Sequence, residues 1–214
     1  MTLRKILILV LFTFAISFAD TLEKIESIIQ NSKSIKAKFT QISKIEGFDE
    51  ESKFEGLLYI SKPDKVKIEY VFPEKNIIFV EKDKVIMYNP KDKQAAISKL
   101  SDQFIVVKIF NMIAKNQSLT QLFNVKEKKE NKNELIVYLL PKDNKQLKSL
   151  KIVFLKKNYK IKEIEIIDTE NNKVLLIFKN FEYLDKKIPL ELKLPKNVQI
   201  FSQWSLLIFM LHEY

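Results

Sequence analysis

Apolar and charged residues alternate along much of the chain, with the period of two that is typical of half-buried β-strands. In the clearest case, Lys65–Val71, the side chains of Val66, Ile68 and Tyr70 fall on one face and charged side chains fall on the other. Similar patterns recur at short intervals between Pro, Asn and Gly turn signals. They predict strands over Ile35–Ile45, Phe54–Ile60, Lys65–Val71, Asn76–Val80, Val85–Tyr88, Gln94–Lys99, Glu134–Leu140, Leu147–Leu155, Lys160–Ile167, Lys173–Phe181 and Ile188–Leu194.

Other segments follow a helical period instead. Apolar residues recur at helical spacing in Leu22–Ser34, which predicts an amphipathic helix with Asp20 or Thr21 as its cap. The segment Asp102–Lys115 is too densely apolar for a surface strand and predicts a helix or two short helices. A further helical turn is expected at Leu119–Phe123.

The order helix, strands, helix, strands favours antiparallel meanders over βαβ crossovers, because the turns between strands are short. We therefore expect a mainly β (α+β) domain of about ten strands. The apolar face of such a sheet either packs against the helices as an ordinary core or curls around a cavity that the helices close. The pattern of residues alone leaves both outcomes open.

The N-terminus has the pattern of a signal peptide over residues 1–19. Arg4 and Lys5 precede the uncharged apolar run Ile6–Phe18, and small residues favour cleavage after Ala19. As a helix the run would span about 20 Å, less than the roughly 30 Å hydrocarbon core of a bilayer. We expect export to the periplasm; an uncleaved membrane anchor is the alternative.

Residues 20–203 are expected to form the folded domain, and residues 204–214 form an apolar C-terminal tail. The stretch Trp204–Leu211 is strongly apolar but too short to cross a bilayer. It either packs on the sheet, plugs a cavity mouth or reflects an altered reading frame, and we assign it no function.

The residues needed for most enzyme chemistry are missing. The chain has no cysteine, so it holds neither a thiol nucleophile nor a thiolate metal site, and its single histidine is His212. The carboxylate pair Glu163 and Glu165 lies on an alternating, lysine-rich strand, which is typical of solvated surface. Two glycines are too few for phosphate-binding loops. We expect no catalytic residue, no metal and no cofactor.

The net charge of +10 comes from lysines spread along the predicted strands. A solvated lysine face explains it best, and attraction to anionic lipid head groups is the next interpretation. Nucleic-acid binding would also suit a basic chain, but an exported protein meets little nucleic acid.

Several short motifs occur in an order and spacing that resemble one family, the periplasmic outer-membrane lipoprotein carrier proteins (LolA family). The resemblance extends over roughly 170 residues, most of the chain after the signal peptide. The motifs are Phe39-Thr40-Gln41 at the end of Ser34–Gln41, Gly56–Pro63, Tyr70 with Pro73, Tyr88-Asn89-Pro90 with Gln94-Ala95, Ile113–Asn116, Pro141-Lys142 and Leu147-Lys148.

The resemblance implies an incomplete antiparallel β-barrel with a helical lid over an apolar cavity. It implies a carrier that takes acylated lipoproteins from an ABC transporter in the inner membrane to a receptor at the outer membrane. It also implies a protein that binds no nucleotide itself, and we expect a monomer. A sister group with this fold consists of acylated receptors, and the absence of cysteine places the chain with the carriers.

In this family an arginine in the Gly56–Pro63 element is thought to latch the lid by hydrogen bonds to helix carbonyls, and Lys62 occupies that position. By position, Ile29, Ile113 and Ala114 would face the latch. The candidates for lining the acyl cavity are Phe39, Leu58, Val66, Ile68 and Tyr70. For these five residues a plain core is the alternative, and for Lys62 a solvated strand end.

Two rival functions remain beside lipoprotein transport. One is a carrier of other lipids or amphiphiles on the same fold. The other is a non-catalytic structural or adaptor domain with a solid core, which would bind no acyl chain.

Overall fold

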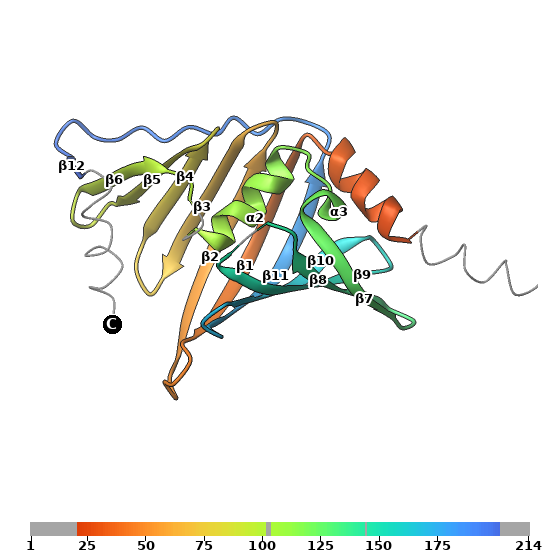
Figure 1. Ribbon diagram of the computed structural model, residues 1–214. Coiled ribbons are helices and arrows are strands. Elements are labelled where there is room, and N and C mark those ends of the chain that lie inside the picture. Colours follow the sequence, from red (N-terminus) through yellow and green to blue (C-terminus); the bar gives the residue numbers. More distant parts are fainter. Residues whose placement is uncertain (1–20, 102–103, 144, 202–214) are drawn as a thin grey trace, which may run out of the picture.

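The computed structural model describes residues 21–101, 104–143 and 145–201, and its main feature is one twelve-stranded sheet (Figure 1). A first helix covers residues 21–31. The remaining elements are β1 (Ser34–Lys44), β2 (Glu51–Ser61), β3 (Lys65–Phe72), β4 (Asn76–Glu81), β5 (Lys84–Asn89), β6 (Gln94–Lys99), α2 (Ile105–Ala114), α3 (Leu119–Leu122), β7 (Phe123–Glu130), β8 (Glu134–Pro141), β9 (Leu147–Leu155), β10 (Lys160–Asp168), β11 (Lys173–Leu184) and β12 (Gln199–Phe201).

The strand order in the sheet is β12-β6-β5-β4-β3-β2-β1-β11-β10-β9-β8-β7. Two antiparallel meanders, β1–β6 and β7–β11, are joined where β1 pairs with β11. The helices α2 and α3 connect β6 to β7, the last strand of one meander to the first strand of the other. Strands β12 and β7 remain as open edges, so the prediction of a mainly β, incomplete barrel is confirmed.

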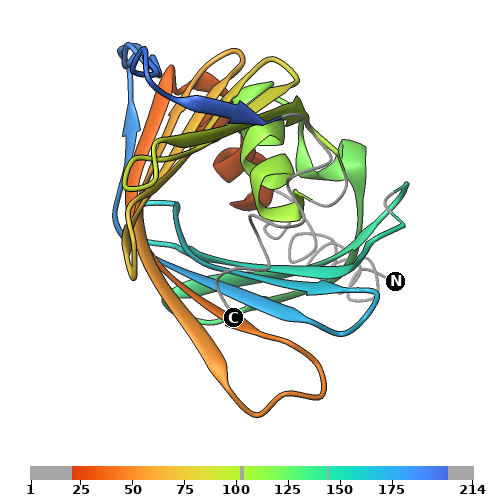
Figure 2. The same cartoon turned by 90° about the vertical axis from the view of Figure 1, so that its left-hand side faces the viewer.

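The alternating pattern decides which face of the sheet is apolar. On β3 the side chains of Val66 and Ile68 are buried, and on β8 those of Leu135, Val137 and Leu139 are buried. In Figure 2 the sheet curls around α2, and Figure 1 shows the first helix at one end of the sheet. Strand and helix side chains there form one continuous core.

The prediction of a strand at Ile188–Leu194 is wrong, because that segment has no ladder partner among the described residues and crosses one end of the sheet as an extended chain. Pro189 and Pro195 each lack a backbone donor, which disfavours strand pairing. The segment is attached by other contacts: the Ile188 N–H donates to Ser34 Oγ at 2.9 Å. Its apolar side chains pack beside Ile77, Tyr88 and Ala95 in a small second cluster.

Two strands were not predicted. Strand β7 carries Lys and Glu on both faces, so it shows no apolar alternation, and it forms a charged open edge. Strand β12 has three residues and pairs in parallel with β6. The described part of the chain therefore forms twelve strands rather than about ten.

Several predictions concern residues outside the described ranges. These are the signal peptide over residues 1–19 with cleavage after Ala19, the cap at Asp20, the start of the second helix at Asp102, and the tail 204–214. Within the described ranges, no helix combines the length and the hydropathy that a membrane crossing requires.

Candidate functional site

The helix α2 is the central element of the candidate site. It contacts β2 and β3 on the concave side of the sheet. Its buried residues are Val107, Ile109, Phe110, Asn111, Met112, Ile113 and Ala114, which lie on nearly all sides of the helix. A helix with such a distribution belongs inside a structure rather than on its surface. Here it occupies the concave side of the sheet, against β2 and β3.

Lys62 follows β2 and is buried, with 7% of its surface exposed. Its Nζ donates hydrogen bonds to the carbonyl oxygens of Ile29 and, at 3.2 Å, Gln30. These residues lie at the C-terminal end of the first helix, where carbonyl groups lack helical partners and attract a cation. Burial lowers the pKa of Lys62 from 10.5 to about 8. The ammonium group therefore anchors the first helix at the cost of its own hydration.

The structure brings some of the predicted latch residues together. Ile29 and Ile113 line the same small cavity, of about 20 Å³, between the first helix and α2. Ala114 is fully buried nearby in the same core. Among the described residues, however, both side-chain hydrogen bonds of Lys62 go to the first helix, and neither goes to Ile113 or Ala114.

A second contact connects the first helix to the α2–α3 segment. The Leu119 N–H donates to Glu26 Oε1 at 2.8 Å, across 93 residues of sequence. Glu26 thus satisfies a free donor in the first turn of α3, whose start also has a capping box formed by Ser118 and Gln121. Sequence reasoning missed Glu26, although Ser118-x-x-Gln121 is a recognisable helix-start signal.

A third contact lies at the end of α2. Lys115 Nζ forms an ion pair with Asp83, in the β4–β5 turn, at a distance of 2.7 Å. Both side chains are substantially exposed, so the pair contributes little free energy and is screened by salt. Lys62, Glu26 and Lys115 together attach the helical segments to each other and to the sheet by polar contacts.

Four of the five predicted lining residues lie in the core beneath α2. Phe39, Leu58, Val66 and Ile68 are each at most 4% exposed. Tyr70 is half-buried: its hydroxyl donates to Gln41 Oε1 at 3.0 Å, and its ring meets the Phe39 ring edge-on at 5.6 Å. In the present position of α2 these side chains contact protein.

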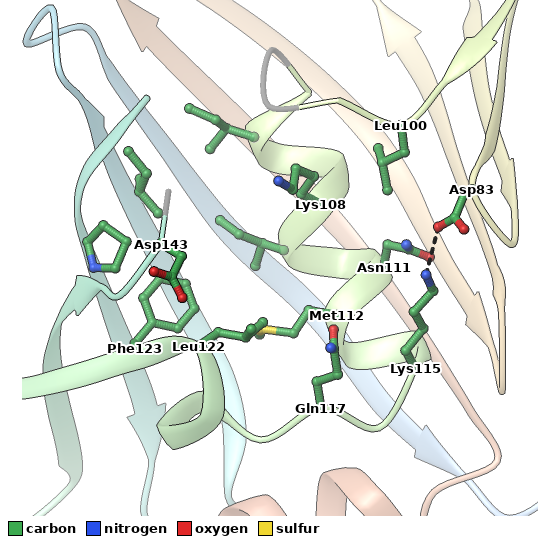
Figure 3. Close-up of a pocket in the computed structure, with 14 residues that line it drawn as sticks. Asp83, Leu100, Lys108, Asn111, Met112, Lys115, Gln117, Leu122, Phe123 and Asp143 are labelled. Carbon is green, nitrogen blue, oxygen red and sulfur yellow. Dashed lines mark hydrogen bonds and ion pairs between the residues drawn. The ribbon is translucent and has the colours of Figure 1, made fainter. Parts of the chain in front are cut away.

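An open, mainly apolar pocket of about 310 Å³ lies beside α2 (Figure 3). On one side it reaches Leu100 and Asp83, and on the other Leu122 and Phe123 at the start of β7. Its lining residues are Asp83, Leu100, Ile105, Lys108, Ile109, Asn111, Met112, Lys115, Gln117, Leu122, Phe123, Pro141, Asp143 and Leu147. Sequence reasoning did not single out this pocket, because its walls come from segments far apart in the chain.

No group of three or more His, Cys, Asp or Glu side chains in residues 21–101, 104–143 and 145–201 is placed to bind a metal ion. The ion pairs of Glu163 and Glu165 with Lys151 on the neighbouring strand are typical of a sheet surface. His212 lies outside the described residues.

A sheet open at both edges, with helices packed in its hollow, defines a class of half-open β-barrels. The family described as outer membrane lipoprotein carrier protein LolA matches residues 30–188, which is most of the chain. The chain therefore belongs to the LolA family, a family of carriers, as the motifs around Phe39 and Lys62 had predicted.

The chain is also similar to individual proteins of known sequence or structure. An outer-membrane lipoprotein carrier protein from Helicobacter hepaticus is 29% identical over 151 residues, which cover 71% of this chain and 72% of that relative. An uncharacterized conserved protein from Thermus thermophilus shares the fold, with a TM-score of 0.52 at 15% identity over 87% of this chain and 99% of that one. A LolA superfamily protein from Nitrosomonas europaea has a TM-score of 0.47 at 11% identity, over 80% of this chain and 94% of that one.

Proposed function

We propose that the protein is a periplasmic carrier that shields the acyl chains of lipoproteins between the inner and outer membranes. Membership of the LolA family supports this role, as does the carrier function in the name of the Helicobacter hepaticus relative. The structural observation that carries the proposal is the position of α2: an apolar helix occupies the hollow and is attached to its surroundings by a few polar contacts.

The energetics of cargo release explain why a carrier would fill its own cavity. Burial of one methylene contributes about 0.8 kcal/mol, so three chains of about sixteen carbons would contribute on the order of 40 kcal/mol if fully sequestered. Non-covalent affinities saturate near about 20 kcal/mol. A carrier that must release its cargo therefore has to offset much of this burial. The return of α2 to the hollow does so, because it buries the same apolar wall again.

In this scheme α2 moves away from β2 and β3 to admit cargo. Phe39, Leu58, Val66, Ile68 and Tyr70 then become the wall of the acyl cavity. Their side chains are aliphatic or aromatic, which suits many different client lipoproteins.

Lys62 acts as the latch of the closed state through the first helix. Its hydrogen bonds to Ile29 and Gln30 fix the position of the first helix. Glu26 of that helix accepts a hydrogen bond from the Leu119 N–H and so connects the first helix to the α2–α3 segment. Ile113 and Ile29 line the same small cavity beside this contact and form its apolar part. The latch is thus a relay over two helices rather than one residue that binds both.

The proposed route sets the partners and the location. We infer export through the signal peptide over residues 1–19, loading by an inner-membrane ABC transporter, and delivery to an outer-membrane receptor. The carrier acts as a monomer and uses neither a nucleotide nor another cofactor.

Release of lipoproteins from spheroplasts tests the proposal. Purified protein added to spheroplasts should bring triacylated lipoproteins into the supernatant, and mass spectrometry of the recovered complex should show a lipoprotein with its acyl chains. A variant with Leu58 and Ile68 both changed to asparagine tests the cavity wall and should release less. Lipid without lipoprotein in the complex would favour a carrier of other amphiphiles. Absence of any bound acyl compound would favour a solid-core adaptor and refute the proposal.

A further inference from the structure

Asn111 is a polar residue in the middle of an otherwise apolar helix. It lies in α2 between Phe110 and Met112, is 4% exposed, and contributes to the wall of the pocket beside α2. Its Oδ1 is buried and accepts no hydrogen bond from any described residue. A buried amide oxygen without a donor is unfavourable in the free protein, so a ligand that supplies an N–H would be recognised by it.

Asn111 stands apart from the contacts that fasten the helices. Lys62, Glu26 and Lys115 make those contacts with other groups, and the backbone oxygen of Asn111 accepts from the Lys115 N–H at 2.9 Å. Among the described residues, its Oδ1 therefore takes no part in the contacts that fasten the helices.

The pocket wall beside Asn111 suits a single hydrocarbon chain. Ile105, Ile109 and Met112 of α2 form one side, and Leu122 with Phe123 forms another. The volume of about 310 Å³ is at the lower end of the range for small-molecule sites. Such a pocket holds part of a large client rather than all of it.

The charges around the pocket balance each other. Its lining contains two lysines, Lys108 and Lys115, and two aspartates, Asp83 and Asp143, and Lys115 is paired with Asp83. This arrangement offers no net attraction to an anionic head group. It favours a neutral polar group at the end of the chain.

We propose that this pocket binds one acyl chain joined to its carrier molecule through an amide, with the amide paired to the side chain of Asn111. A carboxamide has both a donor and an acceptor, so it complements another amide, in which the N–H donates to Oδ1 and the carbonyl accepts from Nδ2. An ester or an ionised carboxylate offers acceptors only and leaves Oδ1 without a partner. The inference rests on the proposed carrier function and adds to it a preference for the amide-linked chain of the cargo.

Two fluorescent probes test the inference on the full-length mature protein. They carry the same acyl chain and the same neutral fluorophore, joined by an amide in one and an ester in the other. Wild-type protein should bind the amide probe about tenfold more tightly, as expected for about one additional hydrogen bond in a buried site. The variant Asn111→Leu, of similar shape, should bind both probes with equal affinity.

Control variants separate recognition from folding. Val106→Ala changes the same helix outside the pocket lining and should retain the amide preference. Asn111→Leu should unfold at the same temperature as the wild type or at a higher one, because it removes an unpartnered buried oxygen. If that variant does not fold, Asn111→Met tests the same loss of the carboxamide.

The outcomes distinguish this inference from the proposed function. Equal binding of both probes by the wild type, or an amide preference that persists in Asn111→Leu, overturns the role of Asn111 and leaves the carrier function intact. Failure of both probes to bind overturns both. Displacement of the amide probe by a lipopeptide with an amide-linked chain supports a lipoprotein source, whereas displacement only by a ceramide-type lipid supports the pocket and contradicts the lipoprotein cargo.

Discussion

Exchanging Lys62 for leucine removes the two hydrogen bonds that attach the first helix to the β2–β3 turn. In our account these bonds stabilise the closed, empty state and are lost when cargo enters. Their removal should therefore strengthen cargo binding and slow its release. Loading should remain intact, while transfer to a receptor should be impaired.

The expected effect of Lys62→Leu on acyl binding follows from two opposing contributions to the free energy of the closed state. Hydrogen bonds from a charged donor contribute about 2 kcal/mol each, or about 4 kcal/mol for two. The lowered pKa of Lys62, about 8 instead of 10.5, corresponds to a burial cost of about 3 kcal/mol for the charged form. The net contribution at neutral pH is on the order of 1 kcal/mol, so Lys62→Leu should tighten acyl binding by roughly fivefold.

The same pKa shift predicts a pH dependence with a definite sign. Between about pH 8 and 10.5 Lys62 is deprotonated in the closed state but protonated once the lid opens and the amine is hydrated. The open state then binds more protons, so rising pH favours the closed state. Wild-type affinity for an acyl probe should fall by roughly tenfold per pH unit in this window, and the loss should reverse when the pH returns to 7.

The assay is fluorescence titration of an uncharged acyl probe from pH 7 to 10.5, with a transfer assay to receptor-containing vesicles at pH 7. Lys62→Arg is the matched control, because arginine keeps the charge and does not titrate in this range. Lys62→Arg should retain transfer and show an affinity that does not change with pH. Lys62→Leu should also show an affinity that does not change with pH, but its transfer should be impaired. A wild-type profile as flat as that of the leucine variant, or normal transfer by Lys62→Leu, would refute the latch.

Two further substitutions test the relay and the sheet. Glu26→Leu removes the acceptor for the Leu119 N–H and should lower stability by about 1 kcal/mol, or about 2–4 °C in Tm, while Glu26→Gln keeps an acceptor and most of the stability. Equal melting curves for both variants would exclude the relay. Gly56→Ala should cost about 3 kcal/mol, because its Cβ would lie 2.7 Å from the backbone oxygen of Glu69. Gly47→Asn is the control, because Gly47 has open space around it and a φ of +85°, and it should lower the free energy of unfolding by well under about 1 kcal/mol. Chemical denaturation measures both variants. A similar loss of stability in the two would contradict the steric argument.

The spacing of apolar residues in the sequence was sufficient to predict the helices and strands that have one buried face. The alternation around Val66 and Ile68 predicts β3 with its correct face, and the dense apolar run predicts α2. The pattern did not predict β7, because Lys and Glu residues occupy both faces of this edge strand. An edge strand that is not buried does not require apolar residues at alternate positions. The alternation in Ile188–Leu194 reflects packing against a small second cluster, without a neighbouring strand.

Less of the candidate site than of the fold could be predicted from the sequence. The position of Lys62 came from a family resemblance, and nothing local indicates that its amine reaches Ile29 and Gln30, some thirty residues earlier in the chain. Glu26 and Asn111 depend on tertiary structure in the same way. Glu26 has its hydrogen-bond partner 93 residues away in the sequence, and the side-chain oxygen of Asn111 is notable because it has no partner among the described residues. Such features arise from the curvature of the sheet, which residue patterns do not encode.

The most direct test of the account is to locate the cargo. A triacylated lipoprotein with a photoreactive group near the end of an acyl chain is loaded onto the protein, irradiated, and mapped by mass spectrometry. If α2 vacates the hollow for cargo, labels should fall on the core-facing residues of β2 and β3, including Leu58 and Ile68, which are 1% exposed in the closed structure. Labels confined to the outer surface of the sheet, with these residues unmodified, would contradict the account.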